Sequence, residues 1–252
     1  SILYGITKGK YNFKVLRYSL FFEDLPEAFE GYQITQISDI HSGSFDNKDK
    51  IEYAVNLVNE QGSDVILFTG DLVNSRSEEM RPWKSTFSKL KAVDGIFSVL
   101  GNHDYGDYTR WSTEKDKAEN FQEMLDIQKE MGFDLLRNES RFIQKDNDRL
   151  AIIGVENWGK GGFQKKGDLK KASESVVQED FKILMSHDPS HWDVQVKQDD
   201  FNYHLTLSGH THGLQFGIEI PGFIKFSPVS FMYKQWAGLY EEFGRYINVN
   251  RG

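Results

Sequence analysis

The sequence has no cysteine, which excludes disulfide bonds, zinc fingers, iron–sulfur clusters and a thiol nucleophile. Any metal must therefore be held by nitrogen and oxygen ligands. Long apolar runs are also absent, since a clean run such as Val65 to Phe68 is far shorter than the roughly 18 residues of a membrane span. The 30 basic residues are outnumbered by 38 acidic ones, and the net charge of −8 argues against a nucleic-acid-binding protein that relies on an overall basic field.

The chain has 252 residues, which at about 150 residues per domain leaves room for one or two domains. No linker rich in Pro, Gly or Ser divides it, and it contains no internal repeat. Its hydrophobic residues, 38% of the total, suffice for a large buried core. We therefore expect one compact domain over residues 32–252, preceded by an amino-terminal arm over residues 1–31, and a monomer.

The amino-terminal arm is basic at its start. Residues 1–22 contain no acidic residue and four basic ones, Lys8, Lys10, Lys14 and Arg17. Two interpretations stay open: a solvated arm, or a juxtamembrane segment facing anionic lipid, where each basic residue adds about 1 kcal/mol of attraction. The chain opens on Ser1 and stops at Arg251-Gly252, so we expect both ends to be trimmed.

Short apolar runs recur along the chain, and each ends abruptly in polar residues. Runs of this kind that are rich in β-branched residues are typical of buried strands. Five of them cover residues 32–38, 64–69, 95–100, 181–185 and 204–207. Between the early runs, apolar residues at helical spacing predict helices over residues 47–61, 85–91 and 115–131. This alternation of strands and helices favours an α/β domain with parallel strands.

The second half of the chain has a stronger β pattern. Residues 134–155 predict hairpins with a turn at Asp146-Asn147-Asp148, and further strands are expected over residues 214–220, 224–226 and 246–249. A mixed sheet, or two stacked sheets, follows from this pattern. Residues 159–171 carry five lysines against one aspartate, which is typical of a solvated loop or of a phosphate-gathering rim near a site.

Polar residues that can bind metal follow five of the expected strands. They are Asp39 and His41, then Asp71, then Asn102 with His103 and Asp104, then His187, and finally His210 with His212. Ligands in open α/β sheets gather outside the carboxyl ends of the strands, so these side chains can converge. Each motif alone is weak, because a lone histidine is more often structural. Within this set, two carboxylates, one amide and four imidazoles can furnish two adjacent divalent cations bridged by one carboxylate.

The ordered series D-x-H, GD, GNHD, H and GHTH resembles the calcineurin-like metallophosphoesterases, from about Tyr32 to the last residue. In finer detail, the sequence is similar to the bacterial membrane-associated YkuE-like branch of that family. The resemblance implies an α/β fold of two stacked mixed β-sheets flanked by helices, and a hydrolase acting on phosphoric ester bonds. The segment Gly213-Leu214-Gln215 departs from the Gly-Gly-Gln usual in that branch. This difference is expected to change the floor of the pocket rather than a metal ligand.

The resemblance also implies a role for each matching residue. Asp39, His41 and His212 hold the first metal, Asn102, His187 and His210 hold the second, and Asp71 bridges the pair. His103 is the catalytic histidine, and Asp104 is placed to orient its imidazole. The implied cofactors are two divalent ions, for which manganese, iron and zinc all suit nitrogen and oxygen ligands. Together they would activate a bridging hydroxide for in-line attack on phosphorus.

The implied reaction is hydrolysis of a phosphodiester or diphosphate bond in a phosphorylated small molecule or lipid, such as a lipid-linked or nucleotide-sugar substrate. A phosphomonoesterase or protein phosphatase is the alternative enzyme, and an inactive scaffold of the same fold is the alternative of another class. The complete ligand set argues against the scaffold, and the excess of acidic over basic residues argues against a nucleic-acid partner. We expect membrane association through a segment upstream of Ser1, with a soluble catalytic domain.

Overall fold

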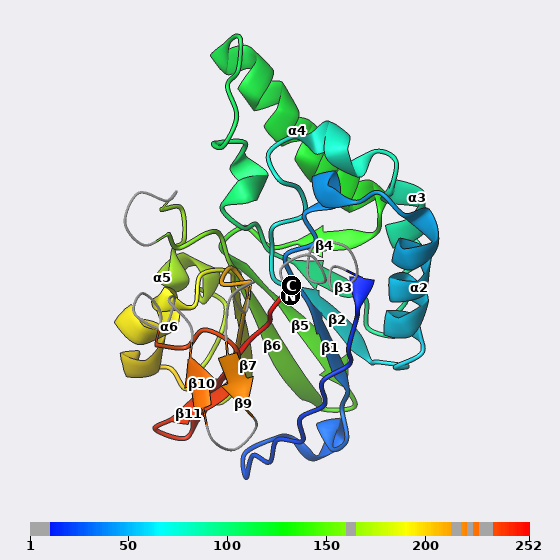
Figure 1. Cartoon of the computed structure of the whole chain (residues 1–252). Coiled ribbons are helices and arrows are strands. Elements are labelled where there is room, and N and C mark those ends of the chain that lie inside the picture. Colours follow the sequence, from blue (N-terminus) through cyan, green and yellow to red (C-terminus); the bar gives the residue numbers. More distant parts are fainter. Residues whose placement is uncertain (1–10, 160–164, 213–217, 221–223, 227–233) are drawn as a thin grey trace.

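The computed structural model describes residues 11–159, 165–212 and 234–252, together with the backbone of residues 218–220 and 224–226 (Figure 1). Its first sheet consists of four parallel strands in the order β1 (Ile34–Ile37), β2 (Val65–Phe68), β3 (Ile96–Ser98) and β4 (Phe133–Leu135). The helices between these strands are α2 (Lys48–Asn59), α3 (Lys84–Phe87) and α4 (Glu114–Glu130). This is the alternation of strands and helices that the sequence predicts.

The second sheet is mixed and has six strands. Their order is β11 (Gly238–Glu242), β12 (Arg245–Val249), β8 (Tyr203–Ser208), β7 (Phe181–Ser186), β6 (Asp148–Val155) and β5 (Glu139–Lys145). The four inner strands are parallel, and the two edge strands are antiparallel to their neighbours. The short helices α5 (Leu169–Ala172) and α6 (Ser190–Val194) belong to this half, and β9 (Ile218–Ile220) and β10 (Ile224–Phe226) form a separate hairpin.

Two stacked sheets flanked by helices confirm the expected fold class, with the first sheet purely parallel and the second mixed. The predicted turn between β5 and β6 is also present, because Lys145 pairs with Asp148 across two intervening residues. Helix α3 is shorter than predicted, and strand β11 was not anticipated. The expected strand over residues 214–220 lies partly outside the described residues, which contain only its end in β9.

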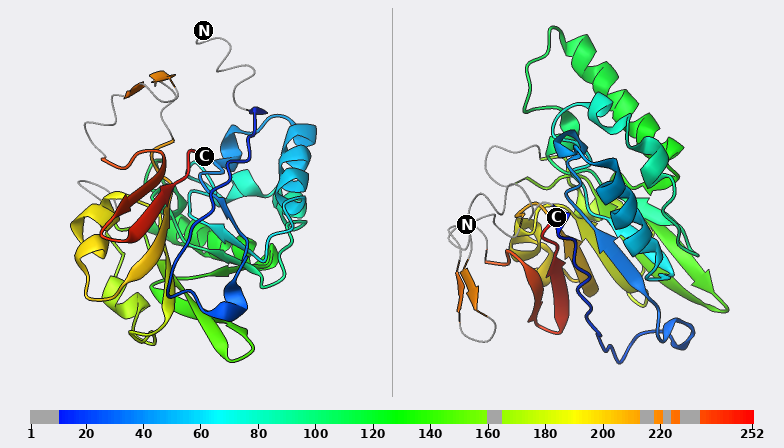
Figure 2. Two further views of the ribbon diagram at one scale, coloured as in Figure 1. Left: turned by 90° about the horizontal axis from the view of Figure 1, so that it is seen from below. Right: turned by 45° about the vertical axis from the view of Figure 1, so that its right-hand side comes forward.

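The molecule has four layers, which Figures 1 and 2 show as helices, sheet, sheet and helices. Strand β2 is buried on both faces: Val65 and Leu67 pack between the sheets, whereas Ile66 and Phe68 pack toward α2, α3 and α4. On the mixed sheet, Ile153 packs with apolar residues of α5 and α6 in a third cluster. Burial on both faces explains why these strands are uninterrupted apolar runs.

The ends of the helices follow from local polar residues. Asn47 precedes α2, and its side chain accepts a hydrogen bond from the Lys50 amide at 3.1 Å. Thr113 and Asp116 form a reciprocal capping box at the start of α4, with hydrogen bonds of 3.1 and 2.9 Å. Such caps satisfy amides of the first turn that lack a partner within the helix. They fix where the chain leaves the loops that follow β1 and β3.

The described part of the arm closes the amino-terminal end of the space between the sheets. The ring of Phe22 packs edge-on against Phe181 at 5.0 Å and Tyr246 at 5.3 Å, near the starts of β7 and β12. Phe29 is fully buried in the cluster between the sheets. Among the described residues, no helix is both long enough and apolar enough to cross a membrane. The opposite end of the sandwich, where the parallel strands terminate, is left for the polar loops.

Gln36 of β1 joins the two sheets just before those loops. Its amide nitrogen donates to Thr69 Oγ1 at 3.1 Å and to the Ser208 carbonyl at 2.8 Å. Its amide oxygen accepts from Asn248 Nδ2 at 2.7 Å. The side chain therefore makes contact with β8 and β12 of the mixed sheet as well as with the end of β2. This contact fixes how the strand ends of the two sheets face each other.

Candidate metal centre

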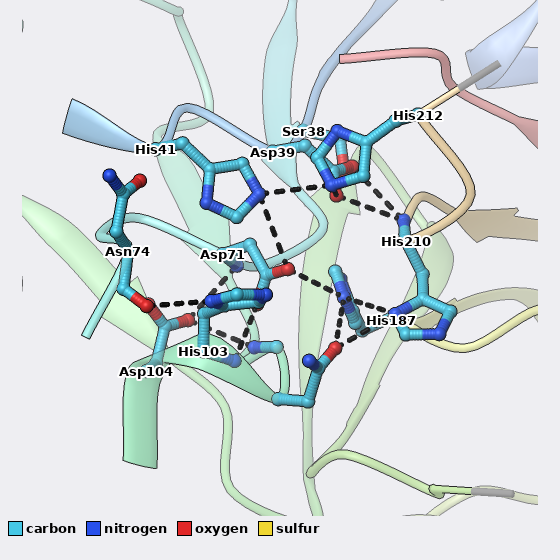
Figure 3. A network of polar contacts seen from close by, with 12 residues as sticks. Ser38, Asp39, His41, Asp71, Asn74, His103, Asp104, His187, His210 and His212 are labelled. Carbon is cyan, nitrogen blue, oxygen red and sulfur yellow. Dashed lines mark hydrogen bonds and ion pairs between the residues drawn. The ribbon is translucent and has the colours of Figure 1, made fainter. Parts of the chain in front are cut away.

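The predicted ligands meet where the two sheets present their carboxyl ends (Figure 3). Asp39 and His41 follow β1, Asp71 follows β2, Asn102 follows β3, His187 follows β7, and His210 and His212 follow β8. The two sheets are linked directly at this point, because the His210 amide donates to both carboxylate oxygens of Asp39, at 3.0 and 3.1 Å. Residues 171 positions apart in the chain are thus in contact.

The first group of ligand atoms comes from Asp39, His41, Asp71 and His212, and these atoms lie within 4.8 Å of one another. The Nε2 atoms of His41 and His212 are 3.1 Å apart. His41 Nε2 lies 3.6 Å from Asp71 Oδ2, and His212 Nε2 lies 3.6 Å from Asp39 Oδ1. Imidazole nitrogens that face each other beside carboxylates fit a cation placed among them.

The second group comes from Asp71, His187 and His210, again within 4.8 Å. The amide oxygen of Asn102 joins it, at 3.1 Å from His187 Nε2 and 2.8 Å from His210 Nδ1. Asp71 Oδ2 is 3.2 Å from His187 Nε2, so this buried carboxylate belongs to both groups. This carboxylate is therefore shared by two sets of nitrogen and oxygen donors, either of which could hold a divalent cation.

Neighbouring groups fix the direction of several ligands. His187 Nδ1 donates to the Thr69 carbonyl at 2.7 Å, which leaves the lone pair of the neutral ring on Nε2, facing Asp71 and Asn102. Ser38 Oγ donates to Asp39 Oδ2 at 2.6 Å. Gly101 and Gly209 lie so close to the ligands that a Cβ atom at either position would collide with the carboxylate of Asp71 or Asp39, respectively.

The charges of the buried groups depend on one another. Burial raises the pKa of Asp71, but the imidazoles of His187, His103 and His41 together outweigh burial and hold that pKa well below its usual range. Burial lowers the pKa of His187, but the carboxylates of Asp71 and Asp39 and the hydrogen bond to the Thr69 carbonyl together raise it to about 10. Burial and the neighbouring His187 lower the pKa of His210 to about 4. A metal that binds at His187 must therefore displace a proton, so metal affinity falls as the pH is lowered.

His103 lies beside both groups. Its Nδ1 donates to the main-chain carbonyl of Asn74 at 2.6 Å, and its amide donates to Asp71 Oδ1 at 2.9 Å. The ring is edge-on to His41, with centroids 4.8 Å apart, and it stacks on Tyr108 at 4.3 Å. The neutral ring consequently carries its lone pair on Nε2. The sequence analysis missed Asn74, because a main-chain carbonyl leaves no signal in residue type.

Asp104 does not make the expected contact with the imidazole of His103. Its carboxylate is fully buried and accepts hydrogen bonds from the amides of Gly101 at 2.9 Å, Asp71 at 3.0 Å and Leu72 at 2.8 Å. Burial and the nearby charge of Asp71 raise its pKa to about 7. Asp104 therefore ties together the loops after β2 and β3, whereas the Asn74 carbonyl orients His103. The expectation fails because main-chain amides of two loops converge on the Asp104 carboxylate and turn it away from His103.

Two other expectations concern loops near the site. In the loop over residues 159–171, residues 160–164 lie outside the described part, whereas Lys166 Nζ lies 4.7 Å from the Tyr105 ring centroid and Asp168 caps α5. The described end of this loop thus packs against the body of the domain. The Gly213-Leu214-Gln215 segment lies outside the described residues.

The sequence matches the family described as calcineurin-like phosphoesterase over residues 32–214. The chain belongs to this family. It is 29% identical to the metallophosphoesterase YkuE of Bacillus subtilis over 231 residues, which cover 90% of this chain and 74% of YkuE. It is also 29% identical to a Danio rerio transmembrane protein with metallophosphoesterase domain, over 88% of this chain and 50% of that protein. The structure of phosphopantetheinyl hydrolase from Mycobacterium tuberculosis aligns with a TM-score of 0.49 and 14% identity, covering 85% of this chain and 87% of that one.

Membership confirms the expected family and makes the protein a phosphoric ester hydrolase with a phosphorylated substrate. In this calcineurin-like phosphoesterase, five of the seven predicted metal ligands have a left-handed backbone. Their φ angles are 52° at Asp39, 45° at His41, 60° at Asp71, 71° at His210 and 51° at His212. Each such residue other than glycine costs about 1 kcal/mol or more. The sharp turns that aim these side chains at one point are therefore a source of strain.

This strain predicts an unusual order of stability at His212, whose side chain is 38% exposed and whose φ is 51°. Without metal, His212→Gly is expected to be more stable than His212→Ala by about 1 kcal/mol, because only glycine adopts this conformation without cost. Urea unfolding in the presence of a chelator measures the difference. As a control, the same pair at the exposed residue Glu119 within α4 should show the reverse order by about 1 kcal/mol. Equal stability of the two His212 variants would show that the backbone there is unstrained.

Proposed function

We propose that the protein is a dinuclear metal-dependent phosphoesterase that hydrolyses a phosphodiester or diphosphate bond. The observation that carries this proposal is the buried carboxylate of Asp71, which belongs to two separate groups of candidate ligands. A single structural metal would need only one of these groups. A surface scaffold that had lost its activity would need neither, whereas here both groups are complete.

The residues present fit two divalent ions. The first would be held by Asp39, His41 and His212, the second by Asn102, His187 and His210, with Asp71 between them. The donors are nitrogen and oxygen atoms only, which suit manganese, iron or zinc. When bound, two such ions supply a water of lowered pKa and neutralise negative charge on the phosphoryl group.

The chain's own groups contribute the remaining chemistry. Because His103 Nδ1 donates to the Asn74 carbonyl, proton exchange at this imidazole takes place on Nε2. A protonated Nε2 can donate to a phosphoryl oxygen or to the leaving oxygen, a contribution of about 10²- to 10⁴-fold. The His103 amide meanwhile donates to Asp71 Oδ1 and holds this carboxylate in place. His103 is therefore the proposed catalytic residue, and Asp104 supports the loops that carry it.

The proposed substrate is a diester or diphosphate, lipid-linked or part of a nucleotide sugar, met at a membrane surface. Similarity to YkuE over 90% of this chain supports the assignment to this branch, and a relative named as a transmembrane protein supports the location. The described part of the arm exposes Lys14 and Arg17 together with apolar Leu16, which is 58% exposed. Basic and apolar side chains together are what an anionic membrane surface attracts.

A substrate panel tests this proposal. After treatment with a chelator, the protein is expected to be inactive, and manganese should restore hydrolysis of an aryl phosphodiester and of a lipid-linked diphosphate. Release of the aryl alcohol measures the first reaction and chromatography of the phosphomonoester products measures the second, with an aryl phosphomonoester assayed in parallel. Cleavage of the monoester alone would replace the proposed substrate class with a phosphomonoesterase. Absence of any metal-dependent hydrolysis would contradict the dinuclear mechanism itself.

A further inference from the structure

Tyr108 makes contact with two residues of the candidate site at once. It lies in the loop between the short 3₁₀ helix η5 (His103–Tyr105) and α4. Its hydroxyl oxygen accepts a hydrogen bond from Asn102 Nδ2 at 2.7 Å. Its ring stacks on the imidazole of His103, with centroids 4.3 Å apart and planes 24° apart. One side chain thus contacts a candidate ligand of the second metal and the proposed catalytic histidine.

The contact with Asn102 anchors this amide at the edge of the metal centre. The two ends of an asparagine amide are alike in shape but opposite in chemistry, because the oxygen accepts and the nitrogen donates. In the structure the oxygen faces His187 Nε2 and His210 Nδ1, and the nitrogen faces Tyr108. A rotation by 180° would direct two N–H groups at a cation. The Tyr108 hydroxyl stabilises the orientation that can bind a metal.

The contact with His103 restricts the plane of the imidazole. The Asn74 carbonyl holds Nδ1 but leaves the ring able to tilt about this hydrogen bond. His41 meets the ring edge-on, with an interplanar angle of 90°, and Tyr108 covers it as a stacked ring. Offset stacking of aromatic rings contributes about 0.5–1.5 kcal/mol. The direction of Nε2 is therefore set by three neighbours rather than by the hydrogen bond alone.

The loop that carries Tyr108 is anchored on both sides, although the side chain is 48% exposed. Before it, the Gly106 carbonyl accepts from Trp111 Nε1 at 2.7 Å, and Asp107 pairs with Lys117 of α4. After it, Arg76 Nη2 donates to the Arg110 carbonyl at 3.3 Å, and the guanidinium lies 4.4 Å from the Trp111 ring centroid. These contacts hold the tyrosine in place from outside the ligand set.

We propose that Tyr108 is a positioning residue of the phosphoesterase site: its hydroxyl anchors the Asn102 amide with the oxygen toward the candidate metal, and its ring aligns His103 with the substrate. The proposal rests on the proposed function, because it assumes that Asn102 is a metal ligand and that His103 acts in catalysis. It separates two effects within one side chain. The hydroxyl governs metal affinity, and the ring governs turnover.

Two substitutions separate these effects. Tyr108→Phe keeps the ring and removes the hydroxyl, so manganese affinity measured by calorimetry should fall by about tenfold, as for other groups that orient a metal ligand. Its kcat at saturating manganese should fall by less than that of Tyr108→Leu, because the ring still stacks on His103. Tyr108→Leu removes the ring as well, and its kcat should fall by about tenfold or more at unchanged KM, because His103 is no longer aligned. Tyr53→Phe on α2, which is also exposed, is the matched control and should change neither quantity.

A double-mutant experiment distinguishes anchoring of the amide from a general structural role. Asn102→Ala removes the amide that Tyr108 contacts. In that background, Tyr108→Phe should have no further effect on manganese affinity. An equally large loss in both backgrounds, or no loss in either, would overturn the proposal.

The Asn102→Ala variant shows whether a negative result concerns only the role of Tyr108 or the proposed function as a whole. If Asn102→Ala binds manganese as tightly as the wild type, the ligand assignment is wrong and the proposed function fails with it. If Asn102→Ala weakens binding and Tyr108→Phe does not, only the inference about Tyr108 fails. Thermal unfolding of each variant in chelator checks that loss of binding does not arise from loss of the fold.

Discussion

Replacement of Asp71 by asparagine is expected to lower phosphoesterase activity by more than about 100-fold and to remove at least one metal. Changes in groups that only support a metal ligand already cost about 10- to 100-fold. Asp71 is the one residue common to both candidate ligand groups of the described chain. Without its charge, repulsion between two dications at short range is less compensated.

Elemental analysis and steady-state kinetics on manganese-loaded protein measure this loss. Asp134→Asn on β4 is the matched control. It removes the same charge from an ion pair with Arg141, and both residues lie outside the two ligand groups. It should keep both metals and full activity. Two metals per chain and near-normal turnover in Asp71→Asn would show that this carboxylate is not the bridge.

His103→Asn is expected to keep near-normal metal content while its turnover falls by about 10²-fold or more, the cost of removing a general acid. The reason is geometric. His103 Nδ1 is engaged by the Asn74 carbonyl, and the residue lies outside both sets of converging ligand atoms. Its chemistry therefore concerns the transition state rather than metal binding.

Comparison of the two variants under the same conditions separates these roles. Metal content should fall in Asp71→Asn and persist in His103→Asn, although both lose activity. Calorimetric titration of His103→Asn with manganese should give an affinity close to that of the wild type. If His103→Asn loses its metals as readily as Asp71→Asn, then His103 is a ligand and the assigned roles are wrong.

The strands of the site could be predicted because their patterns are local. The run Val65–Phe68 is apolar throughout, since β2 is covered by helices on one face and by the mixed sheet on the other. The polar residues that follow each run predicted where the carboxyl ends of the strands meet. The contact between Asp39 and His210 follows from this rule and from the resemblance to a known family. No periodicity in the sequence specifies it.

Other features could not be predicted because they depend on partners distant in the chain. Strand β11 has a weak apolar pattern and exists through its pairing with β12, where Tyr240 lies opposite Ile247. The hydrogen bond from His103 to Asn74 uses a main-chain carbonyl, which any residue type would offer. Asp104 was assigned to the neighbouring imidazole by proximity in sequence, whereas its carboxylate accepts from main-chain amides of two loops.

The left-handed turns at five predicted ligands imply that metal binding and stability of the fold are coupled. At about 1 kcal/mol each, these turns consume a substantial share of a domain's usual net stability of about 5–15 kcal/mol. A metal that binds only the folded chain raises the free energy of unfolding by about 2.7 kcal/mol at a free metal concentration 100 times its dissociation constant. We therefore expect the metal-free protein to unfold more often than the metal-loaded protein and to be degraded faster by proteases.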